Sequence, residues 1–335
     1  MPDIKGPQFQ WIENWGKLNQ SEKSLHGWAH PGMATTSDNH IVTCDSGEST
    51  IMVFSSDGVL VNSWDGNFVD AHGITVAKES GEEVLWIADN GSKRLQDYDY
   101  EYPPGTDNVS GRVFKVQFDG TEVAELPFPS SVEYKKGRYS PTSIAIDEHR
   151  FGGQGNIWVS DGYGASLVHR FDASGKHNLS IDGTKGAGRF DCPHGIIIDR
   201  RHDTPELYVA DRGNARIQVF DLEGHYLRSF GKDFLSSPSG FVQLGEYMVI
   251  SELKSRLTIV DTNNGFAGYV FPGDSHIQTA GWPNESIDGQ EVIRPSKLNK
   301  EEFNSPHGLT ADKDGNLYIA EWLIGGRITK LKLMG

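Results

Sequence analysis

Short apolar runs of about five residues, separated by glycine, aspartate or asparagine, recur along most of the chain. One stretch reads PHGIIID, ELYVAD, RIQVF and HYLRSF between Pro193 and Phe230, with turn residues between successive runs. Runs of this length that alternate or stay apolar between turn residues predict β-strands. Because the connecting segments are short, the pattern predicts an antiparallel sheet of four strands.

The same phrase occurs six times along the 335 residues. Its copies begin at His30, Ala71, Pro141, Pro193, Pro238 and Pro306. Four antiparallel strands repeated six times predict an all-β, six-bladed β-propeller, a fold whose radial closure leaves few free sheet edges. We expect a single domain over residues 1–335, with blades at about 27–64, 69–127, 138–182, 190–231, 233–271 and 304–333.

The last copy supplies only three strands, GLTAD, NLYIAEW and RITKLKL. The segment FQWIENW (9–15), near the N-terminus, resembles the fourth-strand phrase LRSFG (227–231). An N-terminal strand at about 8–15 is therefore predicted to complete the last blade. Such pairing ties both chain ends into one sheet and closes the ring.

Histidine occupies the start of the first strand in alternate blades. The residues at this position are Gly32, His72, Thr142, His194, Ser239 and His307. Alternate blades of a six-bladed ring are about 120° apart, so the three imidazoles are predicted to converge on the central channel. Three histidine ligands with one open position are typical of catalytic zinc. The alternative is that these histidines hydrogen-bond the backbone without a metal. His30 lies out of register with this set and is left out.

An acidic residue ends the second strand of every blade, at the same mouth of the channel as the histidines. These residues are Asp45, Asp89, Asp161, Asp211, Glu252 and Glu321. Carboxylates beside metal-binding imidazoles can orient them. They can equally accept backbone N–H bonds within their own blades, and the sequence leaves both interpretations open.

Tyr163 and Arg212 follow two of these acids directly and should lie at the channel mouth. A tyrosine there can act as a base and an arginine can bind a carboxylate, while packing inside a turn is the alternative for each. The longest insertions, residues 97–111 and 272–303, are expected at the same mouth. Long loops on one face of a rigid ring are usually lids or binding walls.

The phrase VADRGNARIQVF (209–220) resembles the NHL-repeat consensus, and the likeness covers nearly the whole chain. Together with PTSIAID, VSDGY and PHG, it resembles the catalytic core of peptidyl-α-hydroxyglycine α-amidating lyase. This resemblance implies a metal-dependent, lyase-like enzyme that acts on a small substrate bearing hydroxyl and carboxylate groups. It also implies a zinc site on His72, His194 and His307, with Tyr163 as base and Arg212 as anion clamp.

The chain departs from that family at three points. Glycine follows each histidine (Gly73, Gly195 and Gly308), where the family has one acid that helps to bind a structural calcium. Ser305 stands where the family has a methionine, and a first-blade arginine has no counterpart. We therefore expect zinc rather than calcium, and a substrate that can differ from the family's.

Two other functions remain open at this stage. The chain could be a lactonase- or esterase-type propeller hydrolase, a class that uses calcium on carboxylate and amide ligands. It could also be a non-catalytic NHL propeller that binds other proteins. Metal analysis would separate the three possibilities, because three histidines favour a borderline metal such as zinc.

The composition of the chain limits the classes of molecule that it is expected to bind. The formal net charge is −15, from 46 acidic and 31 basic residues, which disfavours nucleic acid. The N-terminal residues lack an apolar run and no later stretch is long enough to span a bilayer, so we expect a cytoplasmic protein with no membrane association. Cys44 and Cys192, the only cysteines, are predicted to be buried thiols. A small-molecule substrate is expected, and the oligomeric state is not predicted.

Overall fold

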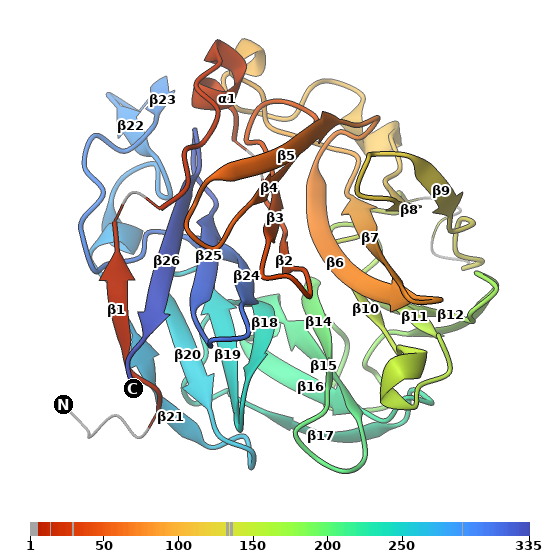
Figure 1. Cartoon of the computed structure of the whole chain (residues 1–335). Helices are drawn as coiled ribbons and strands as arrows, with labels where there is room; N and C mark the ends of the chain where they lie inside the picture. The colour runs from red at the N-terminus through yellow and green to blue at the C-terminus, as the bar shows by residue number, and fades with distance from the viewer. Residues whose placement is uncertain (1–5, 14, 29, 132–133, 135–136, 290) are drawn as a thin grey trace. The chain divides into compact units, whose positions relative to one another are not determined.

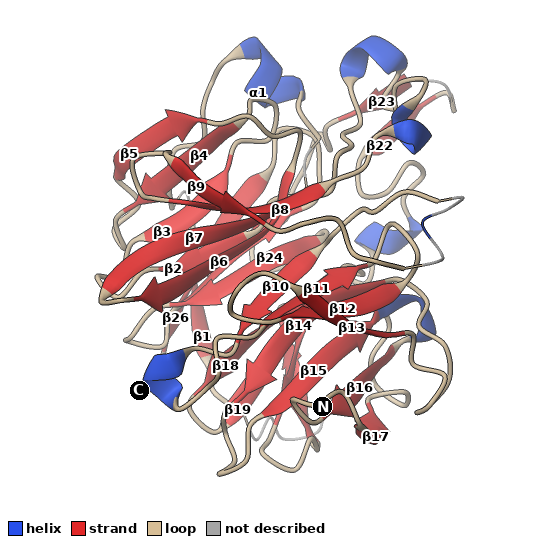
Figure 2. Ribbon diagram, turned by 90° about the vertical axis from the view of Figure 1, so that its right-hand side faces the viewer, coloured by secondary structure: helices blue, strands red, loops and turns tan. Residues whose placement is uncertain are grey.

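Six four-stranded sheets make up most of this computed structural model (Figure 1). The structure describes residues 6–13, 15–28, 30–131, 134, 137–289 and 291–335. Residues 1–5 and Ala29 of the predicted domain, Asn14 of the predicted N-terminal strand and Gln290 of the second insertion lie outside the described residues. Strands dominate and helices are short in Figure 2. The predicted all-β, six-bladed propeller is confirmed.

The chain divides into two compact units. The first unit comprises Met1–Asp70, Lys93–Pro104 and Phe241–Gly335, and the second comprises Ala71–Ser92 and Gly105–Gly240. The assignment of residues 1–335 to one domain stays a prediction. Among the described residues, no helix has the length and apolar character needed to cross a membrane.

The second unit holds three complete sheets, each with its strands in sequence order. They are β6 (Ala71–Glu79), β7 (Glu82–Asp89), β8 (Arg112–Val116) and β9 (Glu122–Glu125); β10 (Ser143–Ile146), β11 (Ile157–Asp161), β12 (Leu167–Phe171) and β13 (His177–Ile181); and β14 (Pro193–Asp199), β15 (Glu206–Asp211), β16 (Arg216–Phe220) and β17 (Tyr226–Phe230).

The other three sheets, apart from the start of β18, belong to the first unit together with a small hairpin and one α-helix. Their elements are β2 (Met33–Thr35), β3 (Ile41–Cys44), β4 (Thr50–Phe54) and β5 (Leu60–Asp65); β18 (Pro238–Leu244), β19 (Tyr247–Glu252), β20 (Arg256–Val260) and β21 (Phe266–Val270); β24 (Pro306–Ala311), β25 (Leu317–Glu321), β26 (Arg327–Leu333) and β1 (Phe9–Ile12); the hairpin β22 (Glu285–Ile287) and β23 (Glu291–Ile293); and α1 (Glu22–His26). Short 3-10 helices lie at Gln96–Tyr98, Thr106–Asn108, His149–Phe151, Arg212–Asn214 and His276–Gln278.

The N-terminal strand completes the last sheet, as predicted. β1 pairs antiparallel with β26, with Trp11 opposite Leu331, and the sheet order is β1-β26-β25-β24 (Figure 1). Phe9 and Trp11 are buried while Gln10 between them is exposed, as the two-residue period of a strand requires. The Trp11 ring lies 4.9 Å from that of Phe303, so this strand also contributes to the core.

Burial changes from strand to strand within a blade. In β15, Leu207, Tyr208 and Val209 are completely buried, because the second strand is covered on both faces. In β17 the exposed fraction alternates along the strand instead. Each fully buried aliphatic side chain contributes about 1.5–3 kcal/mol. The apolar run of the inner strands therefore holds each blade in place, and the outer strands carry the polar residues.

Candidate metal centre

Each of the three predicted histidines lies at an irregularity in its sheet. Ala71 pairs with Asp89, but the register shifts before Gly73, which leaves His72 as an extra residue on β6. The register shifts in the same way at His194 on β14 and at His307 on β24. An extra residue of this kind forms a β-bulge, which re-aims its side chain out of the regular alternation.

The glycine after each histidine admits a backbone carbonyl of the neighbouring strand. A Cβ at Gly195 would lie 2.4 Å from the Ser239 carbonyl oxygen, and one at Gly73 would lie 2.8 Å from that of Thr142. Any other residue would push the neighbouring strand away. The close approach of these carbonyls explains why glycine follows each histidine. The resemblance to the lyase family had not suggested this reason.

The same carbonyls hold the imidazoles. His72 Nδ1 lies 2.7 Å from Thr142 O, and His194 Nδ1 lies 2.7 Å from Ser239 O. His307 Nδ1 lies 3.4 Å from Pro31 O. A carbonyl can only accept, so Nδ1 donates the hydrogen and Nε2 keeps its lone pair.

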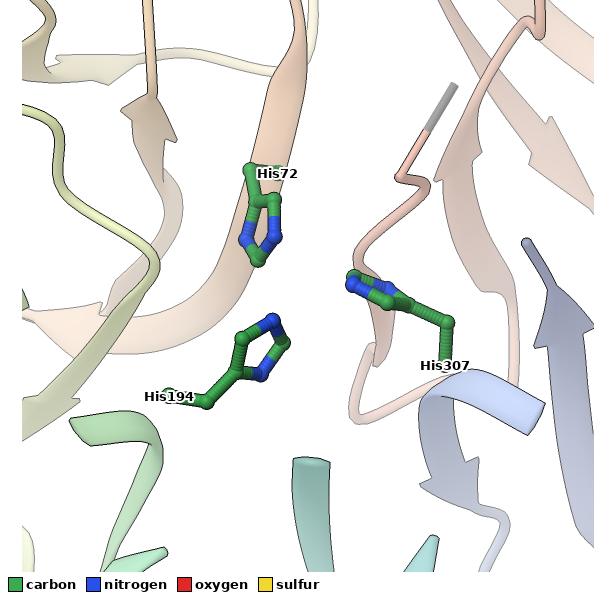
Figure 3. A group of neighbouring side chains, drawn as sticks. All are labelled: His72, His194 and His307. Carbon is green, nitrogen blue, oxygen red and sulfur yellow. The ribbon is translucent and has the colours of Figure 1, made fainter. Parts of the chain in front are cut away.

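His72, His194 and His307 form a group that could hold a metal ion. All three are buried, and each offers one ring nitrogen that lies within 4.8 Å of the other two. Figure 3 draws the three side chains, with the imidazoles of His72 and His194 side by side in the second unit. These are the residues that the alternating sequence position singled out, and their role as metal ligands stays a prediction.

Tyr163 and Arg212 lie beside two of these histidines in the second unit. The Tyr163 hydroxyl is 3.2 Å from His72 Nε2 and 3.1 Å from His194 Nε2. Arg212 Nη1 donates to the same hydroxyl at 3.3 Å, and its guanidinium lies over the Tyr163 ring. The phenol oxygen therefore connects two imidazoles with a cation.

Cys192 belongs to this group as well, which sequence reasoning missed. Arg212 Nη2 donates to Cys192 Sγ at 3.1 Å. Burial raises the pKa of the thiol although Arg212 opposes the shift. Burial lowers the pKa of Arg212. The interactions of its guanidinium with Tyr163 and Cys192 raise the pKa by more, so the net shift is upward. Within the described part of the chain no carboxylate pairs with Arg212.

The acids at the ends of the second strands organise their own turns. Asp161 accepts from the backbone N–H groups of Ser140 and Ala165, and burial raises its pKa. Asp211 accepts from Asp191 N and Arg216 Nε. Asp45 and Asp89 accept from backbone N–H groups of the turns that follow them. Glu252 accepts from Arg256 Nε, and Glu321 accepts from Asn304 N and Arg327 Nε. The Nδ1 atoms meet backbone carbonyls, so the orienting role of the acids stays a prediction.

His30, which the register argument left out, lies beside His307 in the first unit. It is buried, and its Nδ1 lies 3.1 Å from Asp70 Oδ2. Its ring is 5.5 Å from that of His307 and stacks on Trp322 at 5.3 Å. The sequence carried no signal for this placement beyond the short distance between His30 and the start of the first strand.

The aromatic residues of the insertions differ in exposure. Tyr100 is buried against Trp28, whereas Tyr98 and Tyr102 are exposed. The Trp282 indole donates to the Asn304 carbonyl at 3.1 Å. Contacts within the first unit therefore explain the positions of the Tyr100 and Trp282 side chains.

No protein-family model matches the chain. It is 29% identical over 282 residues to the human NHL repeat-containing protein 3, with 81% of this chain and 69% of that protein covered. The chain is thus similar in sequence to NHL repeat-containing proteins and to amidating enzymes. Among the latter, it is 26% identical to rat peptidylglycine alpha-amidating monooxygenase, covering 84% of this chain and 29% of that protein. A Caenorhabditis elegans protein named "Probable peptidyl-alpha-hydroxyglycine alpha-amidating lyase pgal-1" is 22% identical, with 85% and 70% covered.

Solved propellers share the fold of this NHL homologue. Virginiamycin B lyase from Staphylococcus aureus superposes with a TM-score of 0.54 at 14% identity, covering 98% of this chain and 100% of that one. A gluconolactonase from Xanthomonas campestris gives a TM-score of 0.55 at 15% identity, covering 93% and 89%. At these identities the likeness is one of fold alone.

Proposed function

We propose that the chain is a metal-dependent propeller enzyme with lyase-like chemistry on a small substrate that carries a hydroxyl and a carboxylate. The observation that carries this proposal is the position of the Tyr163 hydroxyl, which lies within 3.3 Å of two imidazoles and a guanidinium. A base candidate, a cation and metal-ligand nitrogens meet there in one group. Such a set suits proton abstraction from a bound hydroxyl.

The metal would be held by His72, His194 and His307. Nitrogen ligands of tetrahedral zinc lie about 3.4 Å apart. The three ring nitrogens lie within 4.8 Å of one another, so side-chain shifts of at most about 1 Å would bring them to that spacing. Three neutral imidazoles favour zinc over calcium, which prefers oxygen ligands. When bound, the ion supplies Lewis-acid stabilisation of negative charge on a substrate oxygen.

Arg212 is proposed to bind the substrate carboxylate. Its described partners, Tyr163 and Cys192, are a phenol and a thiol, and the upward shift of its pKa keeps the guanidinium charged. A half-buried guanidinium without a carboxylate beside it favours an anionic ligand, which it can bind through two parallel hydrogen bonds.

Tyr163 is proposed to take the proton of the substrate hydroxyl. In a carbinol of the form N–CH(OH)–COO⁻, the O–H proton passes to the Oη of Tyr163 in its phenolate form. The oxygen's electron pair forms the new C=O bond, the C–N bond breaks, and the nitrogen takes up the proton that Tyr163 returns, which regenerates the phenolate. The products are an aldehyde acid and an amide. The names of the homologous amidating enzymes support this reaction class.

The test is turnover of an N-acyl-α-hydroxyglycine by the purified protein, followed as release of glyoxylate and amide. We expect activity that a chelator removes and zinc restores. We expect Arg212→Gln to raise the KM by about 10- to 100-fold, as for loss of a hydrogen-bonded charge, while the metal content stays unchanged. Absence of turnover in the zinc-loaded protein would refute the proposed reaction.

The hydrolase and the non-catalytic propeller remain alternatives. A calcium-dependent hydrolase would need free oxygen ligands. Most of the described second-strand carboxylates already accept hydrogen bonds from their own turns or from arginines. This arrangement favours a nitrogen-bound metal. The likeness to NHL repeat-containing protein 3 is compatible with either an enzyme or a binding module.

A further inference from the structure

Four buried N–H donors without an acceptor gather in one region of the first unit. They are Trp28 Nε1, Arg94 Nε, Asn284 Nδ2 and Trp322 Nε1. Buried polar atoms in native proteins nearly always have a hydrogen-bond partner, and each unpartnered one is costly. All four are donors, so what this region lacks is acceptors.

Three of the four donors belong to one stack of flat groups. The Arg94 guanidinium lies 5.0 Å from the ring centroid of Trp28, and Trp28 lies 5.1 Å from Trp322 at a tilt of 32°. Tyr102 covers Arg94 at one end of the stack, and His30 covers Trp322 at the other. The flat groups therefore cover one another's faces, and the N–H groups without an acceptor lie on the edges of the stack.

Asn284 joins the stack through its neighbours. Its Oδ1 accepts from Ile324 N at 2.9 Å, and Ile324 packs in the same apolar cluster as Trp28. Because Oδ1 must face a donor, the amide cannot be reversed, and Nδ2 remains the unpartnered end. Asn284 itself is 1% exposed.

Other tryptophans show that the cluster is unusual. Trp282 donates to Asn304 O and Trp15 donates to Ser56 O. Trp158 Nε1 also lacks an acceptor, but it lies alone in an apolar core of the second unit. A single unpartnered indole therefore marks no site, whereas four donors in neighbouring side chains do.

We propose that Arg94, Trp28, Trp322 and Asn284 bind a carboxylate or another small oxyanion. A carboxylate only accepts and has about four lone-pair positions, whereas a water molecule would bring donors of its own. Arg94 supplies positive charge, and Glu101 faces it only at 3.7 Å from an exposed position. Val292, in the insertion at 272–303, packs against the same apolar cluster as Trp28.

This oxyanion site goes beyond the proposed reaction, because it shares no residue with the three histidines, Tyr163 or Arg212. It lies close to His307 within the first unit: His30 stacks on Trp322 and lies 5.5 Å from His307. A substrate bound at His307 could thus place a second acidic group at the stack. Binding of the ion requires no metal.

The test is a titration of the chelator-treated protein with sodium acetate, followed through the indole N–H resonances. We expect the resonances of Trp28 and Trp322 to move with one dissociation constant, while that of Trp282 stays in place. N-methylacetamide, a neutral carbonyl of similar size, should bind at least 10-fold more weakly. Equal affinity for the two probes, or no shift at Trp28 and Trp322, would overturn the proposal.

Phenylalanine variants sharpen the test, because they keep an aromatic ring and remove the donor. Trp28→Phe and Trp322→Phe should each weaken acetate binding by about 3- to 10-fold, and Arg94→Gln by about 10- to 100-fold. Without acetate, the two tryptophan variants should unfold no earlier than Trp282→Phe, which loses a formed hydrogen bond. Unchanged acetate affinity in both tryptophan variants would contradict the site. Failure of metal binding by the histidines would leave these results untouched.

Discussion

The hydroxyl of Tyr163 lies beside three polar side chains of the second unit. Arg212 donates to it, and the Nε2 atoms of His72 and His194 lie within 3.2 Å. The hydroxyl has a single proton, so it can donate to only one of the two imidazoles at a time. This shared position is why the phenol oxygen, rather than either imidazole, is our candidate for proton transfer.

Replacing Tyr163 with phenylalanine removes that oxygen and keeps the ring. Loss of a general base typically costs about 10²- to 10⁴-fold in rate. We expect kcat to fall by that amount while zinc content and folding stay close to those of the wild type. Steady-state kinetics with elemental analysis on the same sample check this. A variant with full activity would remove Tyr163 from the proposed mechanism.

The glycine beside His194 controls the imidazole indirectly. A Cβ at Gly195 would lie 2.4 Å from Ser239 O, the acceptor of His194 Nδ1. Gly195→Ala should therefore displace that carbonyl and lower zinc affinity by about 10- to 100-fold, as for loss of an orienting partner. Gly335→Ala, where a Cβ meets no atom within 4 Å, is the control for affinity. Equal zinc affinity in the two variants would mean that the carbonyl does not orient the ligand.

The sequence singled out the three histidines that form the candidate metal group, but it did not reveal which atoms hold their side chains. The three histidines can be recognised because they occupy the same position in alternate repeats. The carbonyl that holds His72 belongs to Thr142, 70 residues along the chain, and which atom it meets depends on the bulge and on how neighbouring strands pack. Cys192 and His30 were missed for the same reason, because their contacts arise only after folding.

The strand β1 completes the last sheet, and its contribution to stability can be measured through Trp11. Trp11 is buried against Phe271 and Phe303, whereas Gln10 on the same strand is exposed. Trp11→Ala should lower the free energy of unfolding by about 3–5 kcal/mol. Gln10→Ala should change it by less than about 0.5 kcal/mol. Urea denaturation measures both, and similar losses would mean that the strand contributes little to stability.

A buried histidine of β12 lies beside Tyr134. The Tyr134 hydroxyl donates to Asp161 and lies 2.8 Å from His169 Nε2, and Ser180 Oγ lies 2.9 Å from His169 Nδ1. Burial, helped by nearby His177, lowers the pKa of His169 to about 3. The folded protein therefore keeps His169 neutral at pH values where the unfolded chain takes up a proton.

The free energy of unfolding should therefore decrease as the pH is lowered below about 6.5, the pKa of histidine in the unfolded chain. The decrease should continue down to about pH 3. One proton corresponds to at most about 1.4 kcal/mol per pH unit. In His169→Gln this part of the slope should disappear, while above pH 7.5 the dependence on pH should match the wild type. Urea denaturation at a series of pH values measures the slope. An unchanged slope in the variant would show that His169 is not the group that titrates.

Secondary structure was largely predictable from the apolar pattern, and the exceptions have physical causes. The inner strands are covered on both faces and read as continuous apolar runs, as in β15. The N-terminal strand was recognised by its likeness to another outer strand, yet it ends at Ile12 rather than at Trp15. Trp15 instead packs against Phe54 and Tyr318, a choice that depends on side chains distant in sequence.

For the whole molecule, the repeat predicted the fold more firmly than it predicted the chemistry. Six copies of one sheet require a closed arrangement, whatever the loops contain. The net charge of −15 says only which partners are disfavoured. The four unpartnered donors near Trp28 could not be foreseen, because they come from four residues that are far apart in the sequence.

We propose that His72, His194 and His307 share one metal ion. The metal content of the purified protein is the measurement that tests this proposal. After exposure to zinc and removal of excess, elemental analysis should find about one zinc per chain in the wild type. His72→Ala, His194→Ala and His307→Ala should each lose most of it, while His149→Ala, at an exposed position, should keep it. A wild type that binds no zinc, or a single-histidine variant that retains it fully, would contradict the account.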